Sequence, residues 1–187
     1  MLDEYADLPP ALGTVVETDR GSLPFALIHG EALVAAAVWA LGEAGVTPVD
    51  YPTTWSAIGE AEEPYVLHDA LCPMTPAAFI AECLRVSLER GAVVIGVRPV
   101  TDTVKTVADG LVGSTLDRSQ LLSVTSPIVL PAEVVAALDE LPTSDFADLA
   151  SQLAGRFPVV TLEAPPEGRR VSSVEDVRLL EALTLPQ

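Results

Sequence analysis

The sequence predicts an α/β fold, a three-layer α/β/α sandwich built on one mixed, mainly parallel sheet. Short apolar segments typical of buried strands alternate along the chain with longer helical segments, and this alternation is typical of layered domains with a largely parallel sheet. The 187 residues are 49% hydrophobic but only 5% aromatic. We therefore expect an aliphatic core in a single domain that spans residues 1–187, after a loose stretch at residues 1–10.

The strands and helices are expected at separate places along the chain. The expected strands are short runs rich in Val, Ile and Leu, at residues 13–17, 65–68, 92–97 and 159–162. The expected helices are longer and have no proline in their interior, at residues 31–44, 76–90, 131–141, 145–153 and 172–183.

Residues that favour helix ends flank several of these segments. Gly45 and Gly91 stand where two helices should end. Thr75 is expected to be the N-cap of the helix that has Pro76 in its first turn. Residues 172–175, Ser followed three residues later by Glu, fit a capping box that opens the last helix.

Two segments depart from the simple alternation. Residues 99–118 alternate Val, Thr and charged residues around an Asp-Gly pair, which predicts a β-hairpin. Because an isolated hairpin is marginal in water, this hairpin should find a partner surface, and we expect a homodimer. Residues 48–63 carry several acids and Pro52, and they show no readable pattern.

The charge balance narrows the function classes. The chain has 27 acidic and 10 basic residues, a net charge of −17, which opposes non-specific binding to nucleic acid or to an anionic membrane. A phosphate site would have to be built locally from a few cations. The longest apolar run is too short to span a bilayer, and residues 1–10 lack the features of a signal peptide. With two cysteines, too few for a disulfide framework, we expect a cytoplasmic protein.

Four segments are unusual in combination. They read VLHDALCP, PVTDTVK, LDRS and RVSSVEDV, at residues 66–73, 99–105, 116–119 and 170–177. In order and spacing they resemble the H-D-A-A-R-P, P-V-x-D-T-x-K, V-D-R and I-K-V-T-x-P-E-D-L motifs of the methylerythritol-phosphate cytidylyltransferase family. The resemblance covers most of the chain from about Leu27 onward. It implies a nucleotide-diphospho-sugar-transferase-like fold in which residues 99–118 form a protruding β-arm.

The resemblance also implies roles for particular residues. Asp69 matches a catalytic aspartate beside the sugar phosphate and the metal-bound nucleotide, so Mg²⁺ is implied if the chain is active. Thr103, Lys105 and Arg118 match substrate-binding residues of the arm, and Arg170 stands where the family has a lysine that contacts the substrate phosphate. The ligand would then be a small phosphorylated molecule. No Cys or His cluster has metal-ligand spacing.

The match is poorest where the family binds the triphosphate. There the family has a Gly-rich loop with an Arg and a Lys, whose backbone amides and cations cradle the phosphates. Residues 18–24 stand in its place and retain only Arg20 and Gly21 as candidate nucleotide-binding residues, with Asp19 adding a negative charge. Cys72 replaces the Arg of the H-D-A-A-R-P motif. These departures indicate impaired or lost CTP binding.

Most of these residues also have a structural interpretation. His68 could be a buried structural histidine, Asp69 could cap a turn, Arg118 could form a surface ion pair, and Arg170 could offset nearby acids. Three functions stay open. They are a cytidylyltransferase with an altered site, a non-catalytic binding or regulatory homodimer, and a partner of an active cytidylyltransferase.

Overall fold

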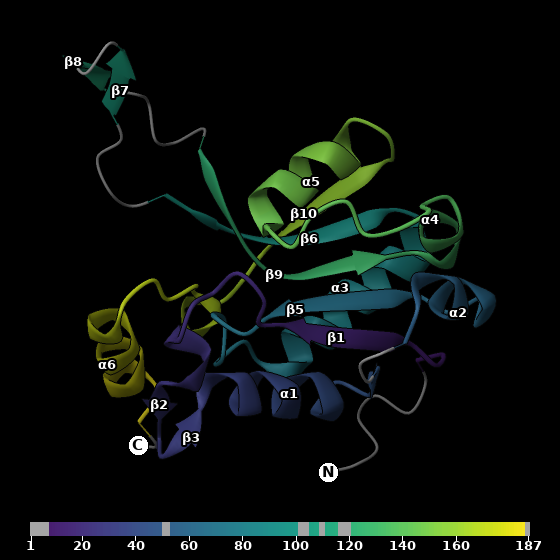
Figure 1. The fold of residues 1–187 in the computed structure, drawn as a ribbon, viewed down its shortest axis with the longest axis horizontal. Helices are drawn as coiled ribbons and strands as arrows, with labels where there is room; N and C mark the ends of the chain where they lie inside the picture. Colours follow the sequence, from purple (N-terminus) through teal and green to yellow (C-terminus); the bar gives the residue numbers. More distant parts are fainter. Residues whose placement is uncertain (1–7, 50–52, 101–104, 109–110, 116–120, 186–187) are drawn as a thin grey trace.

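A six-stranded sheet forms the centre of the computed structural model, which describes residues 8–49, 53–100, 105–108, 111–115 and 121–185 (Figure 1). The strand order is β10-β6-β9-β5-β1-β4. Only the pairs that β9 makes with β5 and β6 are antiparallel, so the predicted mixed, mainly parallel sheet is confirmed. The strands are β1 (Leu12–Val16), β4 (Thr47–Pro48), β5 (Tyr65–Asp69), β6 (Val93–Pro99), β9 (Leu122–Leu130) and β10 (Val159–Glu163).

Helices cover both faces of this sheet (Figure 1). On one face lie α1 (Leu33–Glu43) and α3 (Ala77–Arg90), and on the other lie α2 (Trp55–Glu60), α4 (Ala132–Ala136) and α5 (Phe146–Ala154). Successive side chains of a strand point to opposite faces: Tyr65 and Leu67 pack with the α5 side, whereas Val66 packs with the α3 side. The three-layer α/β/α sandwich is therefore confirmed. In the described part of the chain, no helix combines the length and the apolar character needed to cross a membrane.

A smaller apolar cluster lies beside the sheet. It joins α6 (Val174–Leu183) to the hairpin of β2 (Leu27–Ile28) and β3 (Glu31–Ala32), which follows the short helix η1 (Leu23–Phe25). Ile28, Leu71, Val171 and Leu180 are buried in it. The cluster fixes the last helix against the loop that follows β1. The predicted helix at residues 31–44 is shorter than expected, because its first two residues pair as β3.

The cap predicted for α3 was wrong. Thr75 is buried, and its hydroxyl donates to the carbonyl of Cys72 at 2.9 Å, so Pro76 occupies the N-cap position without a side-chain cap. At the other end of the helix, Gly91 has a φ of 57°, in the left-handed region that favours glycine. The predicted end of α3 is therefore confirmed.

The capping box predicted for the last helix begins one residue too early. Ser173 is the N-cap of α6, and its hydroxyl accepts from the amide of Asp176 at 3.1 Å. Ser172 instead donates to the carboxylate of Asp176 through both its amide and its hydroxyl. The register differs because Asp176, not Glu175, stands three residues after the N-cap.

Several elements were not predicted from the sequence. The unreadable residues 48–63 contain α2, whose N-cap Thr54 accepts from the amide of Ala57 at 3.3 Å. Strand β9 was missed because Pro127 interrupts its pattern, and proline cannot donate to a sheet ladder. Pro127 lies where the pairing with β6 shifts register. The helix predicted at residues 131–141 ends at Ala136.

The predicted β-hairpin is present. Its strands β7 (Lys105–Ala108) and β8 (Leu111–Thr115) pair antiparallel and lie away from the sheet (Figure 1). The turn expected at residues 109–110 lies outside the described residues. A single chain does not test the homodimer, which stays a prediction.

Gly96 marks a point of close approach between β6 and β9. A Cβ atom at this position would lie 2.5 Å from the carbonyl oxygen of Ser126, which is backbone and cannot rotate away. In contrast, a Cβ atom at Gly42 in α1 would meet no atom within 4 Å. A side chain would therefore clash with the backbone at Gly96 but not at Gly42.

We expect Gly96→Ala to lower the free energy of unfolding by about 1–3 kcal/mol, because the methyl group overpacks the β6–β9 contact. Gly42→Ala is the matched control and should raise it by up to about 1 kcal/mol, since alanine favours a helix interior. Chemical denaturation of both variants measures the two changes. Equal effects of the two substitutions would contradict the close approach at Gly96.

Candidate functional site

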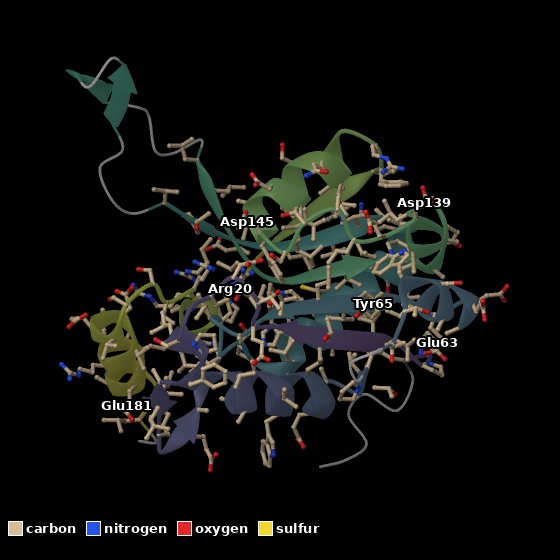
Figure 2. All side chains as sticks on the ribbon, in the orientation of Figure 1. Arg20, Glu63, Tyr65, Asp139, Asp145 and Glu181 are labelled. Atoms are coloured by element: carbon tan, nitrogen blue, oxygen red, sulfur yellow. The ribbon has the colours of Figure 1, made fainter. Side chains whose placement is uncertain are left out.

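Basic side chains gather at one edge of the sheet. The parallel strands β1, β5, β6 and β10 all end at this edge, where ligands bind in open α/β sheets. Arg20 follows β1, Asp69 ends β5, Arg98 lies near the end of β6, and Arg170 follows β10. Figure 2 shows Arg20 at the opposite end of the sheet from Tyr65, where β5 begins.

Asp69 lies between two arginines at the centre of this edge. Its carboxylate is fully buried. Oδ1 accepts from Nε of Arg20 at 3.1 Å and from the amide of Leu71 at 3.0 Å, and Oδ2 accepts from Nε of Arg170 at 3.0 Å. A buried charge needs opposite charges and hydrogen bonds to offset its desolvation. We call this arrangement of Arg20, Asp69 and Arg170 the arginine–aspartate triad.

Arg20 points into the protein. Its side chain is only 4% exposed. Besides Asp69, it donates through Nη1 to the carbonyl of Thr18 at 3.1 Å and through Nη2 to that of Ser144 at 2.7 Å. The guanidinium also lies 5.9 Å from the ring centroid of Phe146. All three nitrogens of the arginine expected to meet a nucleotide are thus engaged inside the chain.

The rest of the loop after β1 is held in the same way. Asp19 has a φ of 60°, and its Oδ2 accepts from the hydroxyl of Ser144 at 2.7 Å. Gly21, the other candidate nucleotide-binding residue, also has a φ of 60° and is exposed. The loop is therefore tied to the segment that leads into α5, with an acidic side chain beside Arg20.

His68 lies in the interior as a buried structural histidine, which is one of the two interpretations offered by the sequence. The ring is fully buried, and Nδ1 forms a hydrogen bond with the hydroxyl of Ser126, which also accepts from the amide of Asp69 at 3.0 Å. Nε2 has no hydrogen-bond partner among the described residues. Burial lowers the pKa of His68 to about 4, although the charge of Asp69 acts in the opposite direction. The ring is therefore neutral at physiological pH.

Cys72, which replaces an arginine of the motif, is fully buried. Burial is the main cause that raises the pKa of its thiol well above the usual range. The charge of Asp69 adds to this effect, and Arg170 and Arg20 oppose it. A thiol that stays protonated is a poor nucleophile. Cys72 is thus a small packing residue.

The structure brings some of the predicted site residues together but not others. Asp69, Arg20 and Arg170 meet in the triad. Lys105 begins β7, on the hairpin that lies away from the sheet (Figure 1). Thr103 and Arg118 lie outside the described residues.

Other polar residues of this edge were not predicted as site residues. Arg98 directly precedes the P-V-x-D-T-x-K motif, and only this position in the sequence could have indicated that it belongs to the site. Thr125 and Ser126 come from β9, and they could not be placed because that strand was not predicted. Arg169 directly precedes Arg170, and this position next to the motif was its only sequence signal.

The residues at this edge do not fit a magnesium site built by the protein. Magnesium prefers open carboxylate oxygens. Both oxygens of Asp69 instead accept from arginines. Within the described ranges, no group of three or more His, Cys, Asp or Glu side chains is placed to hold a metal ion.

We expect the pKa of His68 to make folding sensitive to acid. The unfolded histidine takes up a proton near pH 6.5, whereas the folded ring does so only near pH 4. The unfolded state therefore binds more protons between these values, and stability falls as the pH falls, by up to about 3 kcal/mol.

Urea denaturation at intervals from pH 7 to pH 4.5 would measure the slope of the free energy of unfolding against pH. The substitution His68→Gln should flatten this slope, whatever the substitution does to stability at neutral pH. Equal slopes for the two proteins would show that the buried ring does not resist protonation.

Comparison with known proteins identifies a family and supports the fold described above. The family model of 2-C-methyl-D-erythritol 4-phosphate cytidylyltransferase matches residues 53–165. Two solved structures share the fold. The 4-diphosphocytidyl-2C-methyl-D-erythritol synthase of Anaerococcus prevotii has a TM-score of 0.67 at 14% identity, with 95% of this chain and 98% of that chain covered. The 2-C-methyl-D-erythritol 4-phosphate cytidylyltransferase of Thermus thermophilus has a TM-score of 0.65 at 19% identity, with 91% and 96% covered.

Curated relatives give the same family. The 2-C-methyl-D-erythritol 4-phosphate cytidylyltransferase of Corynebacterium diphtheriae is 30% identical over 168 residues, which cover 87% of this chain and 64% of the relative. That of Syntrophotalea carbinolica is 32% identical over 123 residues, which cover 63% and 52%. The chain thus spans about half to two thirds of the length of these relatives. By its matching motifs, fold and relatives, the chain belongs to the 2-C-methyl-D-erythritol 4-phosphate cytidylyltransferase family.

Proposed function

We propose that this chain is a family member in which CTP binding is impaired or lost, while a site for a small phosphorylated ligand is kept. The observation that carries the proposal is the arginine–aspartate triad. The resemblance puts Asp69 beside the metal-bound nucleotide, but both of its oxygens accept from arginines of the same chain. Neither Asp69 nor Arg20 is thereby open to a triphosphate.

The loop after β1 supports the same conclusion. Transfer of a nucleotidyl group depends mostly on positioning the phosphates and neutralising their charge. Residues 18–24 contain one glycine and no lysine, and their arginine donates inward. Each lost contact between a cation and a phosphate would cost about 1.5–3 kcal/mol. Two independent losses approach roughly a thousandfold in rate, since 1.36 kcal/mol is tenfold.

We expect no transfer of CMP from CTP at an enzyme-like rate. The measurement is pyrophosphate release from CTP and methylerythritol phosphate with magnesium present, beside an active cytidylyltransferase as a positive control. Turnover comparable to that control, abolished by Asp69→Ala, would show that the site is functional and that the proposal is wrong.

The ligand side of the site is better preserved. Arg170 is 36% exposed, so it can meet a ligand while its Nε remains bound to Asp69. The triad carries one carboxylate and two guanidiniums, which leaves a net positive charge at this edge. In the proposed site, Thr103, Lys105 and Arg118 of the arm add contacts from a second copy of the chain.

The buried free cysteines Cys72 and Cys83 suit a reducing compartment, so we place the protein in the cytoplasm.

The hairpin favours a second, non-catalytic candidate function. Strands β7 and β8 pair with each other and lie away from the sheet (Figure 1). Because a two-stranded hairpin is marginal by itself, a surface on another chain would stabilise it. That chain is a second copy in a binding or regulatory homodimer, or an active cytidylyltransferase for which this chain is a partner.

We expect the chain to be a homodimer that depends on the hairpin. Light scattering after size exclusion should give twice the 19.6 kDa of one chain. A variant with residues 101–119 replaced by a short Gly-Ser linker should be a monomer that keeps its helix and strand content in circular dichroism, because the hairpin lies away from the sheet. A monomer of the unaltered chain at high concentration would rule out the homodimer, and co-purification with an active family member would then identify the alternative.

A further inference from the structure

The outward side of helix α1 is unusual for a helix at the surface. Residues 32–42 contain no charged side chain, although the chain as a whole carries a net charge of −17. One side of the helix is buried through Leu33, Ala37 and Leu41. The exposed residues of the opposite side, which we call the α1 face, are Ala35, Val38, Trp39 and Gly42. A helix that is apolar all round is normally covered on all sides.

Helix α3, which packs beside α1 on the same side of the sheet, has the expected polar surface. Its outward side carries Glu82, Arg85 and Glu89, and Arg85 forms ion pairs with both glutamates. Charged residues on the exposed side are typical of a helix that faces water. The two helices therefore occupy the same layer, but only α3 is built to face solvent.

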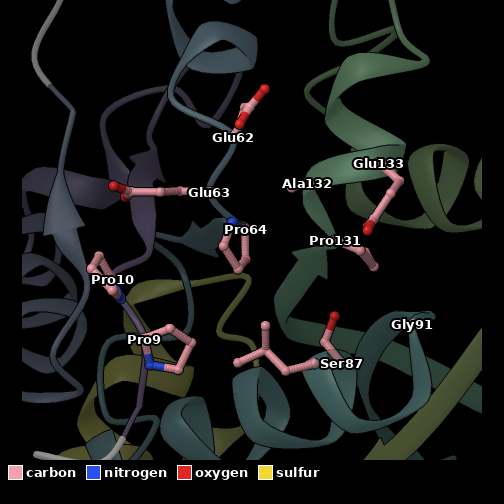
Figure 3. A pocket seen from close by; sticks show the side chains of 11 residues that line it. Pro9, Pro10, Glu62, Glu63, Pro64, Ser87, Gly91, Pro131, Ala132 and Glu133 are labelled. Carbon is pink, nitrogen blue, oxygen red and sulfur yellow. The ribbon is translucent and has the colours of Figure 1, made fainter.

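The exposed apolar residue of α3 also has charged surroundings. Leu88 lines a surface cavity of about 360 Å³ together with Glu62, Glu63 and Glu133 (Figure 3). Single exposed apolar residues among polar neighbours are normal on a protein surface and need no explanation. The α1 face differs because its apolar residues are contiguous along one side of a helix.

The α1 face has both a protrusion and a hollow. Trp39 is 75% exposed, the highest value among the large apolar side chains that the structure describes, and Val38 is 42% exposed. Three residues after Trp39, a Cβ atom at Gly42 would meet no atom within 4 Å. Ala35, one turn before Trp39, also has a small side chain. Tryptophan is enriched at protein interfaces, where it fills pockets on the partner.

We propose that the α1 face pairs with the α1 face of a second copy of the chain, antiparallel about a two-fold axis. Two-fold interfaces use the same patch on both copies, so the patch must be complementary to itself. A protruding tryptophan and a hollow on one strip meet this condition. Two copies that each carry a charge of −17 repel one another, and a face without charge is where they can approach closely.

The register of the pair follows from the helix geometry. With the axis between positions 38 and 39, Ala35 lies opposite Gly42 of the second copy. Side chains of a helix lean toward its N-terminus, so each Trp39 leans over the Gly42 hollow of the other helix. Glu43 then lies opposite Val34 and not opposite Glu31, so the two acids that flank the helix do not face each other.

This interface is separate from the proposed function. Figure 1 shows α1 at the lower side of the molecule, whereas the hairpin of β7 and β8 projects at the upper left. The α1 face contains no residue of the arginine–aspartate triad, and it leaves the hairpin free for its own contact. The fate of the α1 face is therefore independent of CTP binding and of the hairpin.

The contact should be weak. Helix α1 has 11 residues, which corresponds to a length of about 16 Å. A tryptophan buries roughly 150–250 Å², so two such faces bury less than about 1,200 Å², the size of weak and transient contacts. At the low concentrations of size exclusion the pair is therefore open, and it does not alter the mass expected from the hairpin.

Sedimentation of the full chain from about 10 µM to about 1 mM tests the proposal, since weak contacts form in this range. We expect the average mass at least to double with concentration, whether the species at low concentration is one chain or a hairpin dimer. Trp39→Gln should weaken this association about tenfold or more. Leu88→Gln, on the neighbouring helix, is the matched control and should leave the association unchanged.

Gly42→Leu separates a fitted interface from a generally sticky surface. The substitution adds apolar area but fills the hollow, so it should weaken association if Trp39 of the second copy occupies that place. Stronger association would overturn the proposed pairing. Higher salt should strengthen association of the unaltered chain, because it screens the repulsion between like-charged copies. Weaker association at higher salt would contradict an uncharged contact.

Fluorescence assigns the contact to the tryptophan itself. The chain has two tryptophans, so Trp55→Phe leaves Trp39 as the only one. Its emission should shift to shorter wavelength, and its quenching by acrylamide should fall severalfold, over the concentrations at which the mass rises. A constant mass up to 1 mM would overturn the proposal, as would a shift seen only with phosphatidylcholine vesicles, which would assign the α1 face to a lipid surface.

Discussion

The buried carboxylate of Asp69 is the interaction on which this edge of the molecule depends. It joins the loop after β1, through Arg20, to the segment after β10, through Arg170. The amide of Val171 adds a hydrogen bond to the carbonyl of Leu71 at 2.8 Å. A charge buried in this way is stable only while its partners stay, because an unpaired ion in the interior costs several kcal/mol.

The same interaction limits what the edge can do chemically. Arginines that donate to Asp69 are neutralised in part by it, and Arg20 has little exposed surface left for a ligand. Arg170 is different, since it is anchored at one nitrogen and also lines a cavity together with Arg98 and Arg169. Of the two cations of the triad, Arg170 is therefore the one with side-chain surface left exposed.

Strand β9 connects the core to this site. It runs antiparallel between β5 and β6, and its residues Thr125 and Ser126 lie near the ends of its two neighbours. Ser126 fixes the buried ring of His68, and its carbonyl lies so close to β6 that only a glycine fits at position 96. Polar groups at the edge are therefore held by contacts that begin inside the sheet.

The sequence by itself determined the layered fold, most helices and strands, the hairpin, and the motif positions of Asp69 and Arg170, because apolar periodicity, turn residues and motifs are local signals. It did not determine β9, where Pro127 hides the pattern, or the partners of Asp69. Only the tertiary structure decided that Arg20 donates inward and that Arg98, Thr125 and Arg169 share one cavity. These residues are far apart in sequence, and which groups meet at a sheet edge depends on strand order and on the burial of charge.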